Sequence, residues 1–562
     1  MKQISRTQQV ALQADNTKQL RTIVVDLTPV LPGGENGGAK VFVLELLRRL
    51  AERAPQTQFV LLTQAAAHEE LAALDRENVR RLMVLDLNNP PALRSLANRI
   101  SSRLFRYLPE RPRRIAQRSF NRLKPMLRRN TQSAIVRELS ADLLFCPFTA
   151  PTYFEMTIPT VSVIYDLQYK TYPEFFPAAD VAQRDRTFID AARRSTMLVS
   201  ISEYSRQVAI KYGKLDPAQI RTVHLHISQH SLRNAARDEA VLDRLQLTPG
   251  QYLIYPANFW KHKNHEMLLT AFGIARSNGL DNNIRLVCTG APGARQQWLK
   301  EAAEGLGLGN HVLFPGYLAN AELLALITNS VGVIFPSLYE GFGLPVIEAM
   351  ATGVPVACSN VTSLPEVAGD AAILFDPRMP DDIARALTAL AHDKELTSRL
   401  VRAGELRATQ FSDSKLMAEQ YWEAFQHAAG LEFKPNLLVG VYPDGWVGPN
   451  PKVQVSSSTQ NRTLNLEILV PDWAPVSKVT MRICQEGNIK SEITVPRGKD
   501  GRLSVPMSVT GGSFDIELAP AFIPALTGAG DDQRELAAIL KKCEIVGSDG
   551  SFVSLFPEST ST

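Results

Sequence analysis

Short runs of apolar, often β-branched residues alternate with longer stretches of helical periodicity along the first three quarters of the chain. The earliest run, RTIVVDL (21–27), is typical of a buried strand, and the stretch after Lys40 places apolar residues at helical spacing. Regular alternation of this kind predicts a doubly wound parallel sheet with helices on both faces. Further strand candidates in this first unit are FVLLT (59–63), LMVLDL (82–87), DLLFC (142–146), VSVIY (161–165) and MLVSI (197–201).

The same alternation begins again near residue 250 and predicts a second α/β domain of similar size. Open parallel sheets bind ligands at the carboxyl ends of their strands, so we expect a ligand cleft between two Rossmann-like domains. The segment after Phe411, SDSKLMAEQYWEAFQHA, has the pattern of a long amphipathic helix, which we expect to close this second unit. The strand candidates of the unit are YLIYP (252–256), IRLVCTG (284–290), HVLFPG (311–316), VGVIFPS (331–337), VPVACS (354–359) and AAILFD (371–376).

Beyond residue 435 the pattern changes to short alternating runs separated by Gly, Asn, Asp and Pro, which predicts a small all-β sandwich. The stretch DDQRELAAILKKC (531–543) has helical spacing and is expected to interrupt or cap this sandwich. The expected organisation is therefore a disordered N-terminal tail, two Rossmann-like domains and a β-sandwich-like accessory domain. Their expected bounds are 1–20, 21–235, 236–432 and 433–562.

Length and composition agree with a multidomain globular protein. A chain of 562 residues is too long for one hydrophobic core, and 45% hydrophobic with 21% charged residues is ordinary. The N-terminal residues lack the apolar segment of a signal peptide, and no stretch approaches the ~18 apolar residues of a membrane span. We therefore expect a cytoplasmic protein, with peripheral contact at the inner face of the cell membrane as an addition. Free thiols are expected for the five scattered cysteines, Cys146, Cys288, Cys358, Cys484 and Cys543.

Positive charge is concentrated in one segment of the first domain, although the formal net charge is only +4. Residues 93–130 hold twelve arginines and lysines against the single acid Glu110, with apolar residues interleaved at helical spacing. Two interpretations stay open, a solvated helical arm or a surface that binds an anionic membrane or a phosphate-bearing acceptor. No nucleic-acid motif accompanies the segment, so no nucleic-acid partner is expected.

The most informative segment is FPSLYEGFGLPVIEAMATGVPVACSNVTSLPEVAGDAAILFDP (335–377). A strand ends near Ser337, a glycine-containing loop follows, and a helix begins near Pro345 and ends at Gly353. Such a strand–loop–helix unit directs backbone N–H groups and the positive helix end at an anion, typically a phosphate. Glu340 in the loop and Glu348 in the helix are expected to face the same cleft, where carboxylates accept hydrogen bonds from sugar hydroxyls.

This segment resembles a known family. The Glu-x7-Glu spacing, the EGFGLP loop, the EAMATGVPV stretch and the later SLPEVAGDAAILFDP resemble the retaining GT-B glycosyltransferases of family 4 (group 1), above all bacterial mannosyltransferase-like members. The resemblance covers about residues 21–430 and implies an N-terminal acceptor domain facing a donor-binding domain. It implies that Glu340 contacts the donor sugar and that Glu348 binds the ribose. Close approach of the backbone to sugar and phosphate is implied at Gly341, Phe342, Gly343 and Leu344.

A cation on the donor side is expected from YPANFWKHKNHEMLLTAF (255–272), which follows the first strand of the second domain. Lys263 is the candidate to hold the donor diphosphate and to stabilise the departing negative charge. Relatives commonly have an arginine or second base nearby, where this chain offers Lys261 and His262. Asn258 is a further candidate for donor contact, and Tyr317 and Leu318 are implied to face the nucleobase.

Two segments of the first domain are implied to lie opposite the donor. Gly37 and Gly38, in LPGGENGGAKV (31–41), are the candidates nearest the diphosphate and acceptor; the loop is not the G-x-G-x-x-G of nicotinamide-binding proteins. Many relatives have His-Asp where this chain has Tyr165-Asp166. A phenol titrates near ~10, so Tyr165 is not expected to act as a base. Asp166 is a candidate for the acceptor site or, equally, for a turn or helix cap.

Two clusters leave alternatives open. His224, His226 and His230 have the composition of a metal site, but strand alternation accounts for the first two, and we expect no bound metal. Tyr442, Asp444, Trp446 and Trp473 are candidates for an aromatic sugar platform, although aromatic residues of a small sandwich more often belong to its core.

The expected activity is retaining, metal-independent transfer of a hexose, with mannose favoured, from a nucleoside-diphosphate sugar such as GDP-mannose. The acceptor implied by the resemblance is a saccharide or lipid-linked molecule of cell-surface polysaccharide, O-antigen or lipopolysaccharide synthesis. Two alternatives remain, a nucleotide-sugar epimerase of the same fold and a non-catalytic carbohydrate-binding scaffold. No cofactor is expected beyond the nucleotide-sugar co-substrate.

Overall fold

The computed structural model describes residues 19–33, 37–85, 135–155, 157–227, 238–431, 436–442, 444–456, 458–530, 532 and 534–555. Most of the tail expected over 1–20, the basic segment 93–130 and His230 lie outside these ranges. Within the described part of the chain, no helix is long and apolar enough to cross a membrane.

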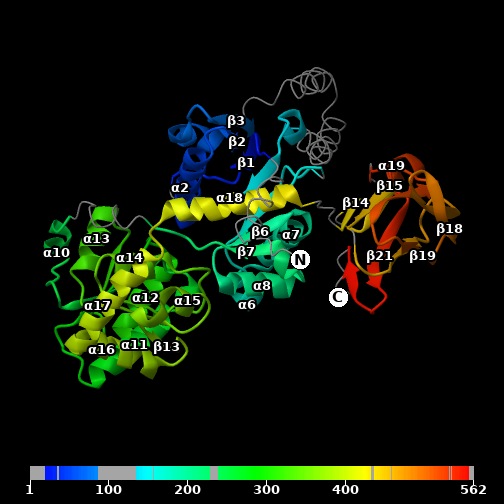
Figure 1. Ribbon diagram of the computed structural model, residues 1–562. Helices are drawn as coiled ribbons and strands as arrows, with labels where there is room; N and C mark the ends of the chain where they lie inside the picture. Colours follow the sequence, from blue (N-terminus) through cyan, green and yellow to red (C-terminus); the bar gives the residue numbers. More distant parts are fainter. Residues whose placement is uncertain are drawn as a thin grey trace, which may run out of the picture.

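The first domain is a seven-stranded sheet in the order β3-β2-β1-β4-β5-β6-β7, and all of its neighbouring strands are parallel (Figure 1). The central strands are buried along their whole length, because helices cover both faces. The strands are β1 (Thr22–Asp26), β2 (Gln58–Gln64), β3 (Val79–Leu85), β4 (Leu143–Cys146), β5 (Thr160–Ile164), β6 (Met197–Ser200) and β7 (Ile220–Thr222). The helices are α2 (Gly37–Arg53), α3 (Ala65–His68), η2 (Glu70–Leu74), α6 (Gln168–Thr171), η3 (Pro173–Phe175), α7 (Ala178–Arg194), α8 (Glu203–Gly213) and η4 (Pro217–Gln219).

The second domain has a six-stranded parallel sheet in the order β10-β9-β8-β11-β12-β13. The chain order reverses beside β8, so the carboxyl ends of β8 and β11 flank a topological switch point, where such sheets bind ligands. The strands are β8 (Tyr252–Pro256), β9 (Arg285–Thr289), β10 (Val312–Gly316), β11 (Gly332–Phe335), β12 (Val356–Ser359) and β13 (Ala372–Phe375). The helices are α10 (Ala240–Arg244), η5 (Lys261–Lys263), α11 (His265–Ser277), α12 (Ala294–Gly305), α13 (Asn320–Thr328), α14 (Leu344–Ala351), α15 (Leu364–Ala368), η6 (Gly369–Ala371), α16 (Pro380–His392) and α17 (Lys394–Thr409).

The long helix α18 (Ser414–Gly430) follows the second domain in sequence but packs on the first (Figure 1). The Tyr421 ring contacts Phe42 on α2 and Phe145 on β4, with centroids 6.1 Å and 5.9 Å away, and Arg53 pairs with Glu419. The expectation that this helix closes the second unit is therefore wrong. Its apolar face is covered by the helices and sheet of the first domain.

The third domain is one antiparallel sheet of nine strands, in the order β18-β17-β20-β15-β21-β16-β19, with β14 and β22 paired to β15 and β21. The end strands β18 and β19 also contact each other, so the sheet curls almost into a barrel rather than forming two separate layers. The predicted combination of two Rossmann-like domains and an all-β domain is confirmed. The elements are β14 (Leu437–Val441), β15 (Trp446–Val455), β16 (Arg462–Val470), β17 (Lys478–Gln485), β18 (Asn488–Pro496), β19 (Lys499–Met507), β20 (Gly512–Ala519), α19 (Pro524–Thr527), β21 (Ala538–Gly547) and β22 (Phe552–Ser554).

The helix expected over 531–543 is wrong, because most of its second half is strand β21. A bulge explains the error. Glu467 pairs with Lys542 and Ile468 pairs with Leu540, which leaves Lys541 as an extra residue on β21. The extra residue breaks the period of two between Leu540 and Cys543 and gives the sequence its helical spacing.

Candidate functional site

The loop between β11 and α14 needs glycine at two positions. Gly343 has φ +114°, and a Cβ added there would lie 2.7 Å from Cδ2 of Leu364. A Cβ on Gly341 would lie 2.5 Å from the backbone oxygen of Tyr165, which belongs to the first domain. The loop that carries Glu340 therefore lies in direct contact with the opposite domain, as close as a glycine allows.

Lys263 and Glu340, predicted to act in one site, form an ion pair. Lys263 Nζ lies 2.6 Å from Glu340 Oε1, and the two side chains are only 11% and 13% exposed. The ammonium group also lies over the Phe335 ring, 5.2 Å from its centroid. Removal of one member of such a buried pair leaves the other charge without its partner, so each side chain holds the other in place.

The turn that presents Lys263 is fixed by the next residue. Asn264 has φ +61°, and its Nδ2 donates hydrogen bonds to the backbone oxygens of Pro336 (3.0 Å) and Pro377 (2.8 Å). These contacts join the end of β8 to the ends of β11 and β13. Asn264 was not singled out from the sequence, although a left-handed asparagine just before a helix is a familiar turn signal.

Glu348 lies on α14, in the turn that follows the loop. Burial raises the pKa of its carboxyl group. Among the described residues it has no hydrogen-bonding or ion-pair partner. A desolvated carboxylate with free acceptor sites is suited to hydroxyl donors of a ligand.

The first domain clasps the glycine loop from the other side. Ser202 caps α8 by accepting from Ser205 N (3.0 Å), and its hydroxyl donates to the Gly341 oxygen (2.7 Å). The Ser205 hydroxyl lies 3.3 Å from that same oxygen. Gly341 is thereby held by the start of a helix of the opposite domain.

Glu366 on α15 reinforces this contact. Its carboxylate accepts from the backbone N–H groups of Glu203 (2.7 Å) and Tyr204 (3.0 Å), the first two residues of α8. It also lies 2.6 Å from His224 Nε2. Burial opposes ionisation, but these hydrogen bonds hold the pKa of Glu366 below its usual value. The carboxylate thus completes the cap of a helix in the other domain.

Asp166 takes the turn-capping role that was one of its two predicted roles, and its acceptor-site role stays a prediction. Its Oδ1 accepts from Gln168 N (3.0 Å) at the start of α6, as a turn-capping residue does. Burial raises the pKa of Asp166, against the positive charges of Arg184 and Lys263. Tyr165 donates its hydroxyl to the Pro147 oxygen (2.9 Å), and burial raises the pKa of this phenol well above its ordinary value. The tyrosine is therefore a hydrogen-bond donor at neutral pH and no base.

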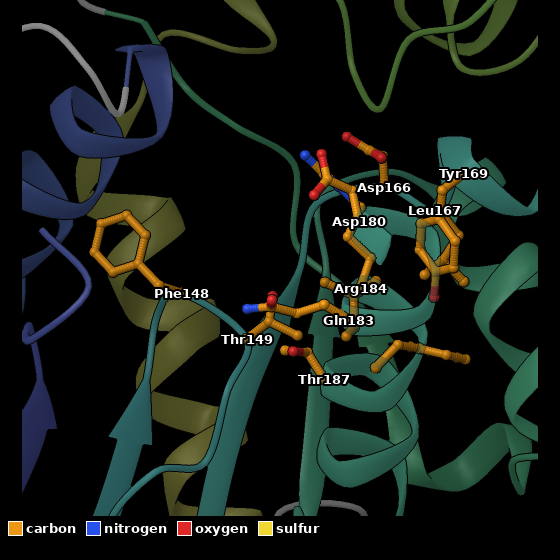
Figure 2. Close-up of a pocket in the computed structure, with 11 residues that line it drawn as sticks. Phe148, Thr149, Asp166, Leu167, Tyr169, Asp180, Gln183, Arg184 and Thr187 are labelled. Atoms are coloured by element: carbon orange, nitrogen blue, oxygen red, sulfur yellow. The ribbon is translucent and has the colours of Figure 1, made fainter. Parts of the chain in front are cut away.

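A pocket of about 420 Å³ opens beside Asp166 in the first domain (Figure 2). Helix α7 lines one wall with Asp180, Gln183, Arg184 and Thr187, and Phe148 and Thr149 after β4 line another. Volumes of this size are typical of small-molecule sites. The sequence did not single out the α7 residues, because a polar helical face is ordinary on a protein surface.

The first glycine loop reaches the donor domain. A Cβ added to Gly38 would lie 3.7 Å from Cδ1 of Leu344, at the start of α14. Gly37 is the first residue of α2 and has φ +52°. Lys40 holds the preceding loop, since its Nζ donates to the oxygens of Leu31 and Gly33, both at 2.9 Å. Gly38 thus lies beside α14 of the second domain, while the predicted closeness of Gly37 and Gly38 to a diphosphate and acceptor stays a prediction. Lys40 was not singled out from the sequence.

The remaining candidates are spread more widely. Asn258 Oδ1 accepts from Ala291 N (2.9 Å), which ties the ends of β8 and β9 together. Tyr317 is 75% exposed, whereas Leu318 is buried in the second domain. The Phe342 side chain is buried against His224 and Phe411, so only its backbone faces outward for a ligand.

Two members of the histidine cluster, His224 and His226, lie in the described part of the chain. His224 bonds Glu366, and burial lowers the pKa of His226 to about 4. In the ranges that the structure describes, no group of three or more His, Cys, Asp or Glu side chains comes together as a metal site would require. His230 lies outside these ranges.

Two parallel-sheet domains with a glycine loop of the second held against the first define the GT-B class of fold. Solved GT-B structures overlay on this chain. HepE from Anabaena, in complex with UDP, gives a TM-score of 0.53 at 18% identity and covers 73% of this chain and 100% of its own. Sucrose-phosphate synthase from Thermosynechococcus elongatus gives 0.50 at 18% identity, over 72% and 98%. At such identities the likeness shows the fold alone.

Residues 243–407 match the family model of the glycosyl transferases group 1. This segment is therefore a group 1 glycosyltransferase domain, as the motifs of the sequence predicted. It is 30% identical over 255 residues to the O-antigen chain mannosyltransferase B of Escherichia coli, covering 45% of this chain and 66% of that protein. It is 26% identical over 223 residues to the serotype-specific mannosyltransferase WbdA of the same species, covering 39% of this chain and 27% of WbdA. The chain thus spans 66% of one relative's length and about a quarter of the other's.

Proposed function

We propose that this protein is a retaining mannosyltransferase that uses a nucleoside-diphosphate sugar, GDP-mannose by preference, and extends a saccharide or lipid-linked acceptor of cell-surface polysaccharide. The observation that carries the proposal is the buried Lys263–Glu340 pair, with Glu348 one helix turn beyond it, inside the group 1 domain. The two Escherichia coli relatives named above support mannose as the sugar and O-antigen as the class of product. Contact of the basic segment 93–130 with an anionic membrane belongs to the same proposal, on the sequence alone.

In this proposal the nucleotide sugar displaces the internal ion pair. Lys263 moves from Glu340 to the diphosphate and neutralises the charge that develops on it. Glu340 turns to the hydroxyls of the sugar, and Glu348 accepts from the ribose hydroxyls. The amides at the start of α14 and the positive end of that helix add to the anion site. The chemistry needs no metal, because lysine and helix supply the positive charge.

The acceptor is proposed to occupy the pocket beside Asp166. Its hydroxyl oxygen bonds the anomeric carbon on the face from which the diphosphate oxygen leaves, and its proton passes to that departing oxygen. The configuration is therefore retained. Asp180, Gln183 and Arg184 of α7 offer the acceptors and donors that a polyhydroxylated ligand requires.

Donor specificity is tested by thermal unfolding of the full chain with a panel of nucleotide sugars. A ligand that binds only the folded state raises the free energy of unfolding, by about 2.7 kcal/mol at a hundredfold excess over Kd. The midpoint temperature of unfolding rises with it. The largest rise is expected with GDP-mannose. A larger rise of the midpoint with a UDP-sugar would show that the donor is not GDP-mannose, but it would not contradict the proposed site.

Catalysis is tested with donor and a mannose-terminated acceptor in the presence of EDTA. Glu340→Gln is expected to lower kcat by about a hundredfold or more while it preserves the fold, because the group that organises the sugar loses its charge. Glu304→Gln, an exposed change on α12, serves as the matched control. Full turnover by Glu340→Gln, or a strict need for a divalent metal, contradicts the mechanism. An isomerised nucleotide sugar formed from donor alone would instead favour the epimerase alternative.

A further inference from the structure

The β domain carries an exposed tryptophan on a foundation of buried aromatic rings. Trp473, in the loop between β16 and β17, is 52% exposed, whereas Trp446 and Phe522 beneath it are 8% and 5% exposed. The Trp446 centroid lies 5.4 Å from that of Trp473, and the Phe522 centroid lies 6.3 Å from it. Packing on one side fixes the indole plane, while the other side is left to solvent. We call these three residues the aromatic platform.

A rigid polar cluster adjoins the platform. Arg534 Nη1 donates to Asp444 Oδ1 (3.0 Å), and Arg534 Nε lies 3.1 Å and 3.0 Å from the two carboxylate oxygens of Asp532. The guanidinium plane also lies over the Tyr442 ring, 4.6 Å from its centroid. One arginine thus holds two carboxylates, and the group carries a net negative charge. We call these residues the Arg534 cluster.

One turn joins the two features. Tyr442 N donates to the Trp446 oxygen (2.7 Å), and the Asp444 carboxylate accepts from the Trp446 backbone N–H. Asp444 and Trp446 are two residues apart, so their Cα atoms lie within about 7.6 Å. On the other side, Phe522 exchanges backbone hydrogen bonds with Leu536, two residues after Arg534. The platform and the cluster therefore share one end of the β domain.

We propose that this end of the β domain is a binding site for a neutral saccharide. A sugar ring places its apolar C–H face on Trp473, and its hydroxyl groups donate to the carboxylate of Asp444, which is 49% exposed. The excess of carboxylates disfavours an anionic ligand, because like charges repel. The fixed positions of Arg534 and of the indole reduce the entropy lost on binding.

The position of the β domain suggests which saccharide it holds. Arg193, at the end of α7, donates to the backbone oxygens of Ser554 (3.0 Å) and Leu555 (3.3 Å) of the β domain. Arg184, which lines the pocket beside Asp166, lies nine residues earlier on the same helix, about 14 Å along its axis. The β domain is thus anchored to the helix that forms the pocket. The ligand is the hexose polymer that the enzyme extends; this identity rests on the proposed function.

The test uses the full chain and a neutral mannose pentasaccharide without donor. Binding is measured by calorimetry and located by hydrogen exchange, and new protection is expected around Trp446 and Trp473. Trp473→Ala is expected to weaken this binding about tenfold or more, since an exposed aromatic anchor carries much of such a contact. Trp298→Ala on α12 is the matched control, because Trp298 is 49% exposed and lies in another domain.

The outcomes separate this site from the transferase activity. Trp473→Ala is expected to keep transfer to a monosaccharide acceptor and to yield shorter products from long acceptors. Wild-type affinity in Trp473→Ala, or no protection at the platform, overturns the site even when transfer is normal. Protection at the platform without any transfer keeps the site and contradicts the proposed function. Equal binding of an acidic galacturonate pentasaccharide overturns the assignment of a neutral ligand.

Discussion

At the scale of single residues, two of the buried charged side chains of the described residues form ion pairs, and one carboxyl group has no hydrogen-bond donor. Lys263 and Glu340 satisfy each other, and Lys40 is held by two backbone oxygens and Glu70. Glu348 is half-buried, burial raises the pKa of its carboxyl group, and its side chain has no partner among the described residues. The local motif predicted that Glu340 and Lys263 would come together, because each lies in the segment that follows the carboxyl end of a strand, β11 and β8. Glu348 lies on α14, the helix after the same loop.

Asp26, at the end of β1, provides a pH-dependent prediction. Burial raises the pKa of this carboxyl group from 3.8 to about 6, although Thr28 donates two hydrogen bonds to it. The folded state thus holds the proton to higher pH than the unfolded state, so stability is lost as pH rises from about 4 to 7. The full effect is about 3 kcal/mol. Asp26→Asn removes this titrating group and with it the pH-dependent loss of stability. The midpoint temperature of the variant minus that of the wild type should therefore be larger at pH 7.5 than at pH 4.5. The same difference in midpoint temperature at both pH values would contradict the raised pKa of Asp26.

At the scale of elements, the start of α8 joins the first domain to the glycine loop and to α15 of the second. Its first three N–H groups bond Glu366 and Ser202, and Ser202 in turn bonds Gly341. The sequence placed Glu366 in a family motif but gave it no role. Its partners are 142 to 163 positions away in the chain, and no local pattern encodes such a contact.

Loss of the Glu366 carboxylate should therefore shift the loop that carries Glu340 and Gly341, while the proposed donor still binds. Glu366→Ala is expected to lower kcat by about ten- to a hundredfold, since small displacements of reacting groups have large effects on rate. The KM for the nucleotide sugar should stay near its wild-type value. Glu366→Gln, which keeps one acceptor oxygen, should recover part of the rate, and the exposed Glu395→Ala is the control. Wild-type kcat in Glu366→Ala would show that the contact is dispensable.

At the scale of the whole molecule, the strands of the two parallel sheets could be predicted, but the partners of amphipathic faces could not. Parallel strands are recognisable from their continuous apolar runs, and both sheets follow them. An amphipathic pattern states that α18 needs a covering surface, but not which of two domains supplies it. The closure of the β domain was also hidden. β18 and β19 are neighbours in the chain but the two ends of the pairing order, and whether such a path closes depends on the twist and curl of all its strands.

The packing of α18 on the first domain predicts that a cavity made in this helix destabilises the first domain and not the second. Tyr421→Ala should destabilise the first domain by about 3–5 kcal/mol, because its fully buried ring packs on Phe42, Phe145 and Phe425. Hydrogen exchange should accelerate in β1, β4 and α2 and remain unchanged in the second sheet. Leu416→Ala, on the exposed side of the same helix, should have little effect. Faster exchange confined to the second domain would refute the assignment.

The return of α18 to the first domain means that the polypeptide passes between the two Rossmann-like halves twice. The first connection, which we call the outward passage, follows β7 and leads to the second domain. The second connection precedes α18 and leads back to the first domain. Ile227 N of the first connection donates to the Phe411 oxygen of the second (2.8 Å). Because the two connections are hydrogen bonded to each other here, we expect any rotation of one half relative to the other to centre on this point. A protease that nicks the outward passage should leave both fragments associated in a native gel, since α18 still anchors the second half to the first.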